Sequence, residues 1–139
     1  MNMIIDSNIL FSALIKDAIT RKIILNYDGY FLFPFFIFEE MEKHKDELLK
    51  KSKMRKHDFN ELLNLLLQKV IIIPSETLLP YKKEALHIVK EIDKNDAMFI
   101  ACALRHQPSV LWTDDKKLKQ QSVIPIIDTS EMIRLSFKS

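Results

Sequence analysis

Five short apolar segments, separated by helix-length stretches, constrain the fold of this chain more than any other feature. They are Met3–Ile5, Tyr30–Phe33, Val70–Ile73, Val110–Trp112 and Val123–Ile127. Strands that are apolar throughout, rather than at alternate positions, are typical of parallel sheets that are covered on both faces. The sequence therefore predicts the α/β class, with three α/β/α layers and a central parallel sheet of about five strands.

Amphipathic stretches between these segments predict the helices. They are expected up to Leu14 after an N-cap at Ser7 or Asn8, then from about Ala18 to Asn26, Phe36 to Lys51, Asp58 to Gln68, Pro80 onward, Ala97 to Leu104, and after Asp128. The chain has no internal repeat and no Gly/Ser-rich linker. We therefore expect residues 1–139 to form one domain.

A single glycine, Gly29, and a single cysteine, Cys102, exclude several classes of protein. Gly-rich dinucleotide and phosphate loops need more than one glycine. One cysteine allows no internal disulfide and no Cys-rich zinc site, which fits a reducing compartment. Asp6 interrupts the N-terminal apolar stretch, so no signal peptide is expected, and no apolar run approaches the length of a spanning helix. We expect a cytoplasmic protein with no membrane partner.

Acidic residues follow or precede the predicted strands where the carboxyl edge of the sheet would lie. They are Asp6 after the first strand, Glu39 and Glu40 in the helix after the second, Asp96 at the start of the helix before the fourth, and Asp114 and Asp115 after the fourth. Carboxylates that crowd together repel one another unless they are protonated or bridged by cations. The four histidines are scattered without a His-x-x-x-His pair, so the ligands would be oxygens, which suit Mg²⁺ or Mn²⁺. This pattern favours metal-assisted phosphodiester hydrolysis.

Each acid also has a purely structural interpretation. Asp6 is suited to capping the helix that follows it, and Asp96 to the positive end of a helix dipole. Glutamates such as Glu39 and Glu40 are common on the exposed faces of amphipathic helices. Asp128, with Glu131 at capping-box spacing, is expected to be structural.

Four motifs, in this order, resemble those of the PIN-domain ribonucleases. They are Ile4–Leu14, with its apolar-Asp-Ser-Asn-apolar-Leu opening, Phe36–Met41, with a glutamate before an apolar residue, Asp93–Leu104, similar to Asp-x-x-Phe-apolar-Ala-x-Ala, and Leu111–Leu118, similar to Thr-x-Asp-Lys. Each motif is weak alone, and the ordered set covers the chain from Met3 to about Leu118.

The resemblance implies a role for individual residues. It implies that the catalytic metal ligands are Asp6, Glu40, Asp96 and Asp115, and that Asn8, Asp93, Thr113 and Asp114 are auxiliary. Glu39 stays an alternative to Glu40, and Asp114, an acid where the family commonly has a small or neutral residue, stays an alternative to Asp115. The implied activity is Mg²⁺- or Mn²⁺-dependent cleavage of single-stranded RNA. Members of this family are often homodimers, and many are VapC-type toxins that an antitoxin peptide holds inactive.

Basic residues lie beside two of the acidic motifs. From Lys43 to Lys56 there are seven Lys or Arg against two acids, although the net charge of the chain is only +2. The residues expected to hold RNA are Lys43, Lys50, Lys51, Lys53, Arg55, Lys116 and Lys117. Such residues contact the phosphate backbone and carry little sequence information, and their alternative role is that of an ordinary solvated surface.

Two alternatives stay open. The chain could be a PIN-like module that binds RNA or protein without cleaving. In addition, the predicted helices Ala18–Asn26 and Asp58–Gln68 carry more apolar residues than one buried stripe needs, Leu62, Leu63, Leu65, Leu66 and Leu67 among them. We expect part of this surface to form a homodimer interface or an antitoxin groove, the alternative being that both helices pack wholly within their own subunit.

Overall fold

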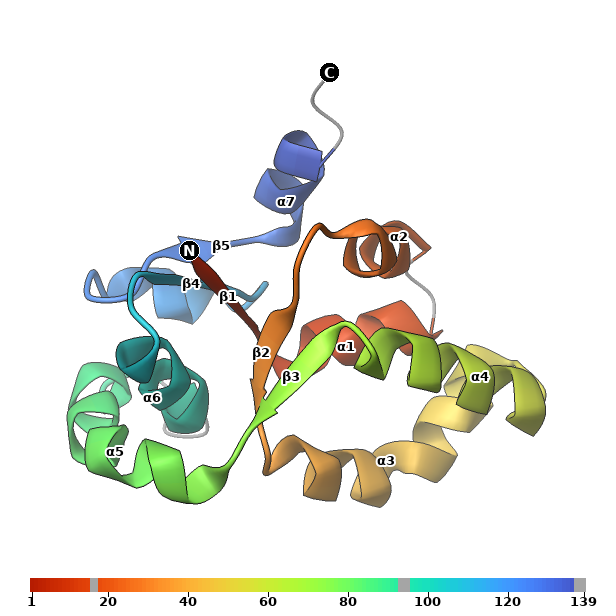
Figure 1. Cartoon of the computed structure of the whole chain (residues 1–139), viewed down its shortest axis with the longest axis horizontal. Helices are drawn as coiled ribbons and strands as arrows, with labels where there is room; N and C mark the ends of the chain where they lie inside the picture. Colours follow the sequence, from red (N-terminus) through yellow and green to blue (C-terminus); the bar gives the residue numbers. More distant parts are fainter. Residues whose placement is uncertain (16–17, 93–95, 137–139) are drawn as a thin grey trace.

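A parallel sheet forms the middle layer of the protein (Figure 1). The computed structural model describes residues 1–15, 18–92 and 96–136. Within them the strands are β1 (Asn2–Ile5), β2 (Phe31–Pro34), β3 (Val70–Ile73), β4 (Ser109–Trp112) and β5 (Ile126–Ile127). They are ordered β3-β2-β1-β4-β5, and every neighbouring pair is parallel. The predicted α/β class with a five-stranded parallel sheet is confirmed.

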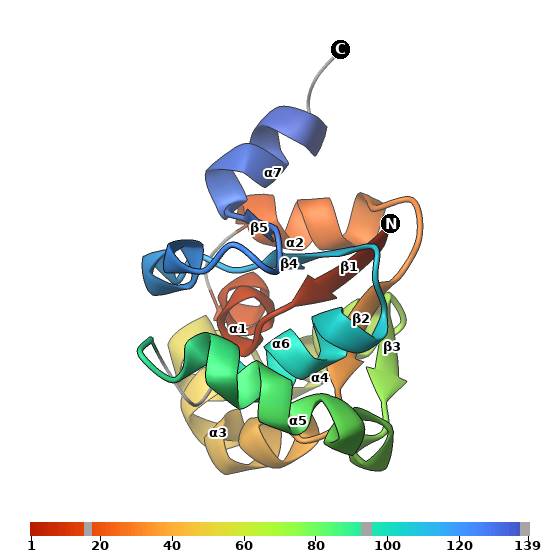
Figure 2. The ribbon, with the colours of Figure 1, turned by 90° about the vertical axis from the view of Figure 1, so that its left-hand side faces the viewer.

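Helices cover both faces of this sheet. They are α1 (Ser7–Ile15), α2 (Ala18–Asn26), α3 (Ile37–Ser52), α4 (Lys56–Leu67), α5 (Ser75–Val89), α6 (Ala97–Arg105) and α7 (Thr129–Ser136), with a 3-10 helix, η2 (Lys116–Gln120), after β4. Helix α6 packs on β1, β2 and β4 and carries α5 on its outer side, whereas α1 to α4 lie on the opposite face (Figures 1 and 2). The three predicted layers are therefore present.

The central strands are apolar on both sides because helices bury both faces. Ile4 and Ile5 in β1, Phe31 in β2 and Trp112 in β4 have no exposed surface. Strand β3 lies at the edge of the sheet, and Ile71 there is 46% exposed. Cys102, on α6, is buried in the core, and this burial raises the pKa of its thiol to about 12.

The chain leaves β1 in one direction and later returns to its other side. The α1–α2 connection leads from β1 to β2, whereas the α5–α6 connection leads from β3 back across the sheet to β4. The order of the strands therefore reverses between β1 and β4. In open parallel sheets, ligands bind beyond the carboxyl ends of the strands at such a point.

The structure corrects three local predictions. Helix α5 begins at Ser75 and not at Pro80. Pro80 lies at an exposed position inside the helix and removes one backbone hydrogen bond, and the burial of Leu78, Ala85 and Val89 offsets that loss. Strand β5 is confined to its last two residues, and the 3-10 helix η2 was not predicted. The third correction is the N-cap of α1, which is Asp6 and neither Ser7 nor Asn8.

Most of the apolar surface of α4 packs inside this chain. Phe59 and Leu66 are buried, Leu62 and Leu63 are half-buried, and Leu65 is 50% exposed. Helix α4 contacts both α1 and α2. The apolar surface that α4 offers to another protein is thus smaller than the sequence suggested. Among the described residues, no helix is both long and apolar enough to cross a membrane.

Candidate functional site

A cavity of about 640 Å³ lies beyond the carboxyl ends of β1 and β4. Its lining residues are Asp6, Ser7, Asn8, Phe11, Phe36, Glu40, His44, Asp96, Phe99 and Asp115. The four acids proposed as ligands thus line a single cavity, although they come from four separate segments of the chain. The cavity lies at the point where the strand order reverses, as the topology leads one to expect.

Asp6 is the most buried of these acids, with 5% of its surface exposed. Its Oδ1 accepts hydrogen bonds from the backbone N–H groups of Asn8 (2.6 Å) and Ile9 (3.3 Å), and its Oδ2 accepts one from the hydroxyl of Thr113. Burial raises the pKa of Asp6 above its ordinary value, because the hydrogen bonds that favour the charged form only partly offset the loss of solvent. The carboxylate is held rigidly at the cavity wall.

Thr113 connects two of the acids. This buried residue donates its hydroxyl proton to Asp6, and the same oxygen accepts the backbone N–H of Asp115 at 3.1 Å. The start of the segment after β4 is therefore fixed relative to the end of β1. Thr113 does not line the large cavity, so the structure gives it the geometry of a positioning residue.

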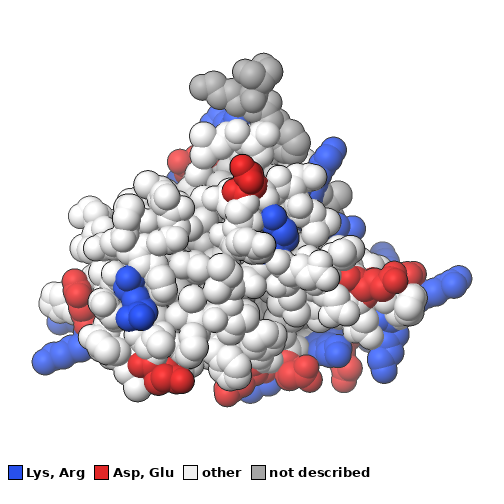
Figure 3. All heavy atoms as spheres, viewed as in Figure 1, with Lys and Arg blue, Asp and Glu red and all other residues white. Residues whose placement is uncertain are grey.

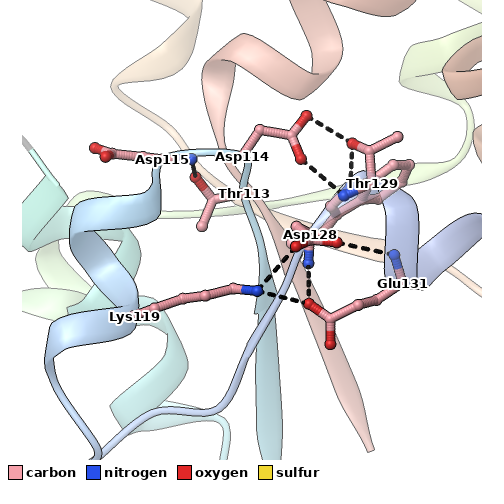
Figure 4. A network of polar contacts seen from close by, with 8 residues as sticks. Thr113, Asp114, Asp115, Lys119, Asp128, Thr129 and Glu131 are labelled. Atoms are coloured by element: carbon pink, nitrogen blue, oxygen red, sulfur yellow. Dashed lines mark hydrogen bonds and ion pairs between the residues drawn. The ribbon is translucent and has the colours of Figure 1, made fainter.

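Asp114 and Asp115 are neighbours in sequence but point in different directions (Figure 4). Asp114 accepts the backbone N–H and the hydroxyl of Thr129, both at 2.7 Å, at the start of α7. Asp115 lines the cavity and accepts the backbone N–H of Lys117 at 3.1 Å, which caps η2. Of the two acids that the sequence could not separate, Asp115 is the one at the cavity.

Glu39 and Glu40, in the first turn of α3, are separated in the same way. Glu40 is half-buried and lines the cavity, where its carboxylate lies 3.8 Å from Lys43 Nζ and 3.6 Å from His44 Nε2. Glu39 is exposed and is not part of the lining. The geometry therefore favours Glu40.

His44 is a cavity residue that the sequence analysis missed. It lies between two carboxylates of its own helix, 3.6 Å from Glu40 and 3.5 Å from Glu47. The signal in the sequence is the spacing of four residues from Glu40, which places both side chains on one face of α3. The search for pairs of histidines could not find it.

Asp96 reaches the cavity from the opposite side of the sheet. It occupies the N-cap position of α6, next to the buried residues Ala97 and Phe99. Asn8, an exposed residue of α1, is part of the lining, as expected of an auxiliary residue. Asp93, the other expected auxiliary acid of this motif, lies outside the described residues.

The donor atoms at this cavity suit a hard divalent cation. Four carboxylates line it together with the hydroxyl of Ser7 and the amide of Asn8, and such oxygen donors fit Mg²⁺ or Mn²⁺. Within the described ranges, no three Asp, Glu, His or Cys side chains are gathered closely enough to share one ion. Like charges repel when no cation lies between them, so an ion would have to draw these carboxylates inward.

The predicted RNA-binding residues lie on two segments that each contribute an acid to the cavity, although none of them lines it. Lys43, Lys50, Lys51, Lys53 and Arg55 are exposed along α3 and the start of α4, and Lys116 and Lys117 are exposed on η2, directly after Asp115. In Figure 3, basic side chains gather around the end of the molecule that α3 and α4 form. Two of them are already paired with acids, Lys43 with Glu40 at 3.8 Å and Lys51 with Glu47 at 2.8 Å.

The protein is thus an α/β protein with a parallel sheet and an acidic cavity at the carboxyl edge of that sheet. The sequence model of the PIN domain family matches residues 4–136, and the chain therefore belongs to this family. Its fold is similar to that of a chain in the crystal structure of VapBC2 from Rickettsia felis bound to a DNA fragment from their promoter. The TM-score is 0.68 at 19% identity, over 92% of this chain and 98% of the other. Among proteins with curated descriptions, none matches the sequence significantly.

Proposed function

We propose that this protein is a metal-dependent endoribonuclease that hydrolyses phosphodiester bonds of single-stranded RNA. The observation that carries the proposal is the convergence of Asp6, Glu40, Asp96 and Asp115 on one cavity at the carboxyl edge of the sheet. A site that only stabilised the fold would gain nothing from four acids around one cavity, because the repulsion between like charges is unfavourable. Membership of the PIN domain family supports the same conclusion.

In the proposed reaction, the carboxylates of Asp6, Glu40, Asp96 and Asp115 would hold Mg²⁺ or Mn²⁺. Bound there, such an ion supplies hydroxide at neutral pH and positive charge against the phosphate. The Thr113 hydroxyl donates to Asp6 and accepts the backbone N–H of Asp115, so it keeps both residues in place. Asn8 lies at the rim, where its amide can orient a water molecule or a phosphate oxygen.

The lysines near the cavity would hold the RNA backbone. Those of α3 and η2 approach it from different elements, so a strand could run across the carboxylates between them. Lysine contacts to phosphates are electrostatic, and we expect binding to weaken steeply with salt.

We further propose that the protein acts as the toxin of a toxin–antitoxin pair, inhibited by an antitoxin protein, and that it forms a homodimer. The support is its family and the similarity of its fold to a chain of the VapBC2 complex. For the homodimer, the structure offers the exposed Leu65 on α4 as one contact.

The neighbouring glutamates provide a matched test of the nuclease. The purified protein should cleave end-labelled single-stranded RNA with Mg²⁺ or Mn²⁺, and chelator should abolish the activity. Glu40→Gln should lower the rate by at least about a hundredfold, because even residues that only support metal ligands change activity by 10–100-fold. Glu39→Gln, prepared in parallel, should cleave as the wild type does and controls for the loss of one charge on α3, while any cleavage that remains in Glu40→Gln reports a contaminating nuclease.

Undiminished cleavage by Glu40→Gln and by Asp96→Asn would assign the chemistry to other residues. RNA binding without cleavage under either ion would favour the alternative of a non-catalytic PIN-like module.

A further inference from the structure

A second hollow, of about 450 Å³, adjoins the acidic cavity between α1 and α3. The two hollows share Asn8, Phe11 and His44, so together they form one continuous groove. Beyond the shared residues, the second hollow is lined by Ser12, Ile15, Glu47, Leu48 and Lys51. The groove therefore leads from the carboxylates to an exposed lysine.

Helical spacing explains why this groove has a consistent lining. Its residues on α1 recur at intervals of three and four, and so do those on α3. They are Asn8, Phe11, Ser12 and Ile15 on α1, and Glu40, His44, Glu47 and Lys51 on α3. One face of each helix thus forms one wall, and the two helices pack against each other.

Two rings lie where the hollows meet. Phe11 and His44 contact each other edge to face, with their ring centroids 6.3 Å apart and an angle of 62° between the ring planes. The His44 side chain is 46% exposed, and Phe11 is half-buried. The carboxylates of Glu40 and Glu47 lie 3.6 Å from Nε2 and 3.5 Å from Nδ1 of His44, on either side of its ring. Phe36 also lines the cavity and packs on Phe99, with their ring centroids 5.4 Å apart.

We propose that this groove binds one nucleotide of the RNA next to the scissile phosphate, with its base packed against the Phe11–His44 ring pair, stacked on the face of one ring and in contact with the other. This inference rests on the proposed nuclease function, which fixes the scissile phosphate at the carboxylates. Proteins that bind single-stranded RNA stack unpaired bases on aromatic and histidine rings. The groove also has the volume of a small-molecule site.

Lys51, the basic residue in the lining, favours a nucleotide over an apolar peptide segment as the occupant of this part of the groove. Lys51 lies at the far end of the groove and Lys43 near the cavity, and both can donate hydrogen bonds to phosphates of the RNA. Lys51 is now paired with Glu47 at 2.8 Å, and a phosphate would replace that carboxylate as its partner. A base in a duplex could not enter, so the groove selects single strands.

Binding measurements on a cleavage-impaired background test the groove. The probe is a fluorescent single-stranded oligoadenylate of about ten nucleotides, and the background is Asp115→Asn. Phe11→Leu, which keeps apolar packing but removes the ring, should weaken binding by about five- to a hundredfold, as should His44→Ala. Phe11→Tyr and His44→Phe keep a ring at each position and should retain most of the affinity. His87→Ala, at an exposed position on α5, is the matched control for His44→Ala.

A spectroscopic signal separates stacking from other effects. An oligonucleotide with 2-aminopurine at one position should lose fluorescence on binding when that base stacks on the rings, and Phe11→Leu should restore it. Circular dichroism checks that each variant is folded, and the exposed His44 provides the test if Phe11→Leu proves unstable.

The outcomes distinguish this inference from the proposed function. If the native protein cleaves RNA while Phe11→Leu and His44→Ala bind the probe as tightly as their background, the groove is not a base site and the nuclease stands. If the two variants lose affinity but the native protein cleaves nothing, the groove is supported and the nuclease is not. Failure of the background protein to bind single-stranded RNA at all would overturn the groove as an RNA site.

Discussion

The neighbouring acids Asp114 and Asp115 should give opposite phenotypes when they are substituted. Asp114 joins the end of β4 to the start of α7 through Thr129, whose backbone N–H and hydroxyl both donate to it at 2.7 Å. The indole N–H of Trp112 donates to the same threonine hydroxyl at 3.1 Å. Asp115 lines the cavity instead. We expect Asp114→Ala to lower stability and Asp115→Asn to lower activity.

The magnitude for Asp114 follows from these contacts. Loss of a capping side chain from a helix N-terminus destabilises proteins by about 0.5–2 kcal/mol, and Asp114 provides two hydrogen bonds with a charged acceptor. Because Asp114 is exposed, solvent compensates for part of the loss, and we expect about 1–2 kcal/mol. With an unfolding entropy of about 2.1 cal/mol/K per residue, this lowers the melting temperature of a 139-residue chain by about 3–7 °C.

Asp115→Asn should leave the melting temperature almost unchanged. Its side chain accepts one hydrogen bond, from the backbone N–H of Lys117, and asparagine caps nearly as well as aspartate. Its cleavage rate should fall by at least about a hundredfold, as for Glu40→Gln. Asp114→Asn, which keeps one acceptor for Thr129, should cleave RNA at close to the wild-type rate.

Thermal unfolding followed by the fluorescence of Trp112 measures both stability and the local contact. Trp112 is the single tryptophan of the chain and is fully buried. Its emission in the folded Asp114→Ala protein should also change, because its threonine partner loses an acceptor. A wild-type melting temperature for Asp114→Ala, or equal losses of activity in Asp114→Asn and Asp115→Asn, would refute the division of roles.

Two further predictions concern the rest of the surface. Hydrogen bonding to Lys119 lowers the pKa of Asp128 to about 2, below its unfolded value near 3.8, so this contribution to stability is present above pH 4 and is lost as the pH falls towards 2. Asp128→Asn preserves the helix cap, so it should lower the free energy of unfolding at neutral pH only by the contribution of the Lys119–Asp128 pair. This contribution is less than about 1 kcal/mol because the pair is partly exposed. In a series of thermal melts, the difference from the wild type should vanish near pH 2. A difference that persists at pH 2 would contradict this account. If Leu65 lies in a homodimer interface, the wild type should sediment as a dimer at micromolar concentration and Leu65→Lys as a monomer. Leu79→Lys, on α5, where the side chain is 59% exposed against 50% for Leu65, should not change the mass. A monomeric wild type would remove the homodimer proposal.

The order of the elements was predictable because each depends on a local pattern. Buried parallel strands are apolar throughout, which is why Met3–Ile5 and Val70–Ile73 were found within one residue of their bounds. The order of the strands across the sheet depends on how α5 and α6 cross it, and no local pattern encodes that. The start of α5 was missed because Pro80 was taken as a helix start, although Ser75 and Glu76 after Pro74 provide the better signal.

In the candidate site, too, local patterns predict which residues are involved, whereas the choice between neighbours depends on packing. The positions of the acids relative to the strands predict a cluster at the carboxyl edge, but they do not decide between neighbours such as Glu39 and Glu40. On a helix, one residue corresponds to a rotation of about 100°, so the choice depends on how α3 is turned towards α1. Only the packing determines that rotation, and it brings Glu40 and His44 to the cavity together.

Asp6 shows why capping and metal binding are not competing interpretations of an acid. A carboxylate has about four acceptor positions on its two oxygens. The backbone N–H groups of Asn8 and Ile9 occupy those of Oδ1, and the Thr113 hydroxyl occupies one of Oδ2. One position on Oδ2 is left for a ligand in the cavity that Asp6 lines. The capping bonds fix the orientation of the carboxylate, while its burial, which raises the pKa, disfavours the charged form in the absence of a cation. A carboxylate whose charge is unfavourable alone and favourable beside a cation is suited to metal binding, so the capping contacts of Asp6 are compatible with the metal-binding role that we propose for it.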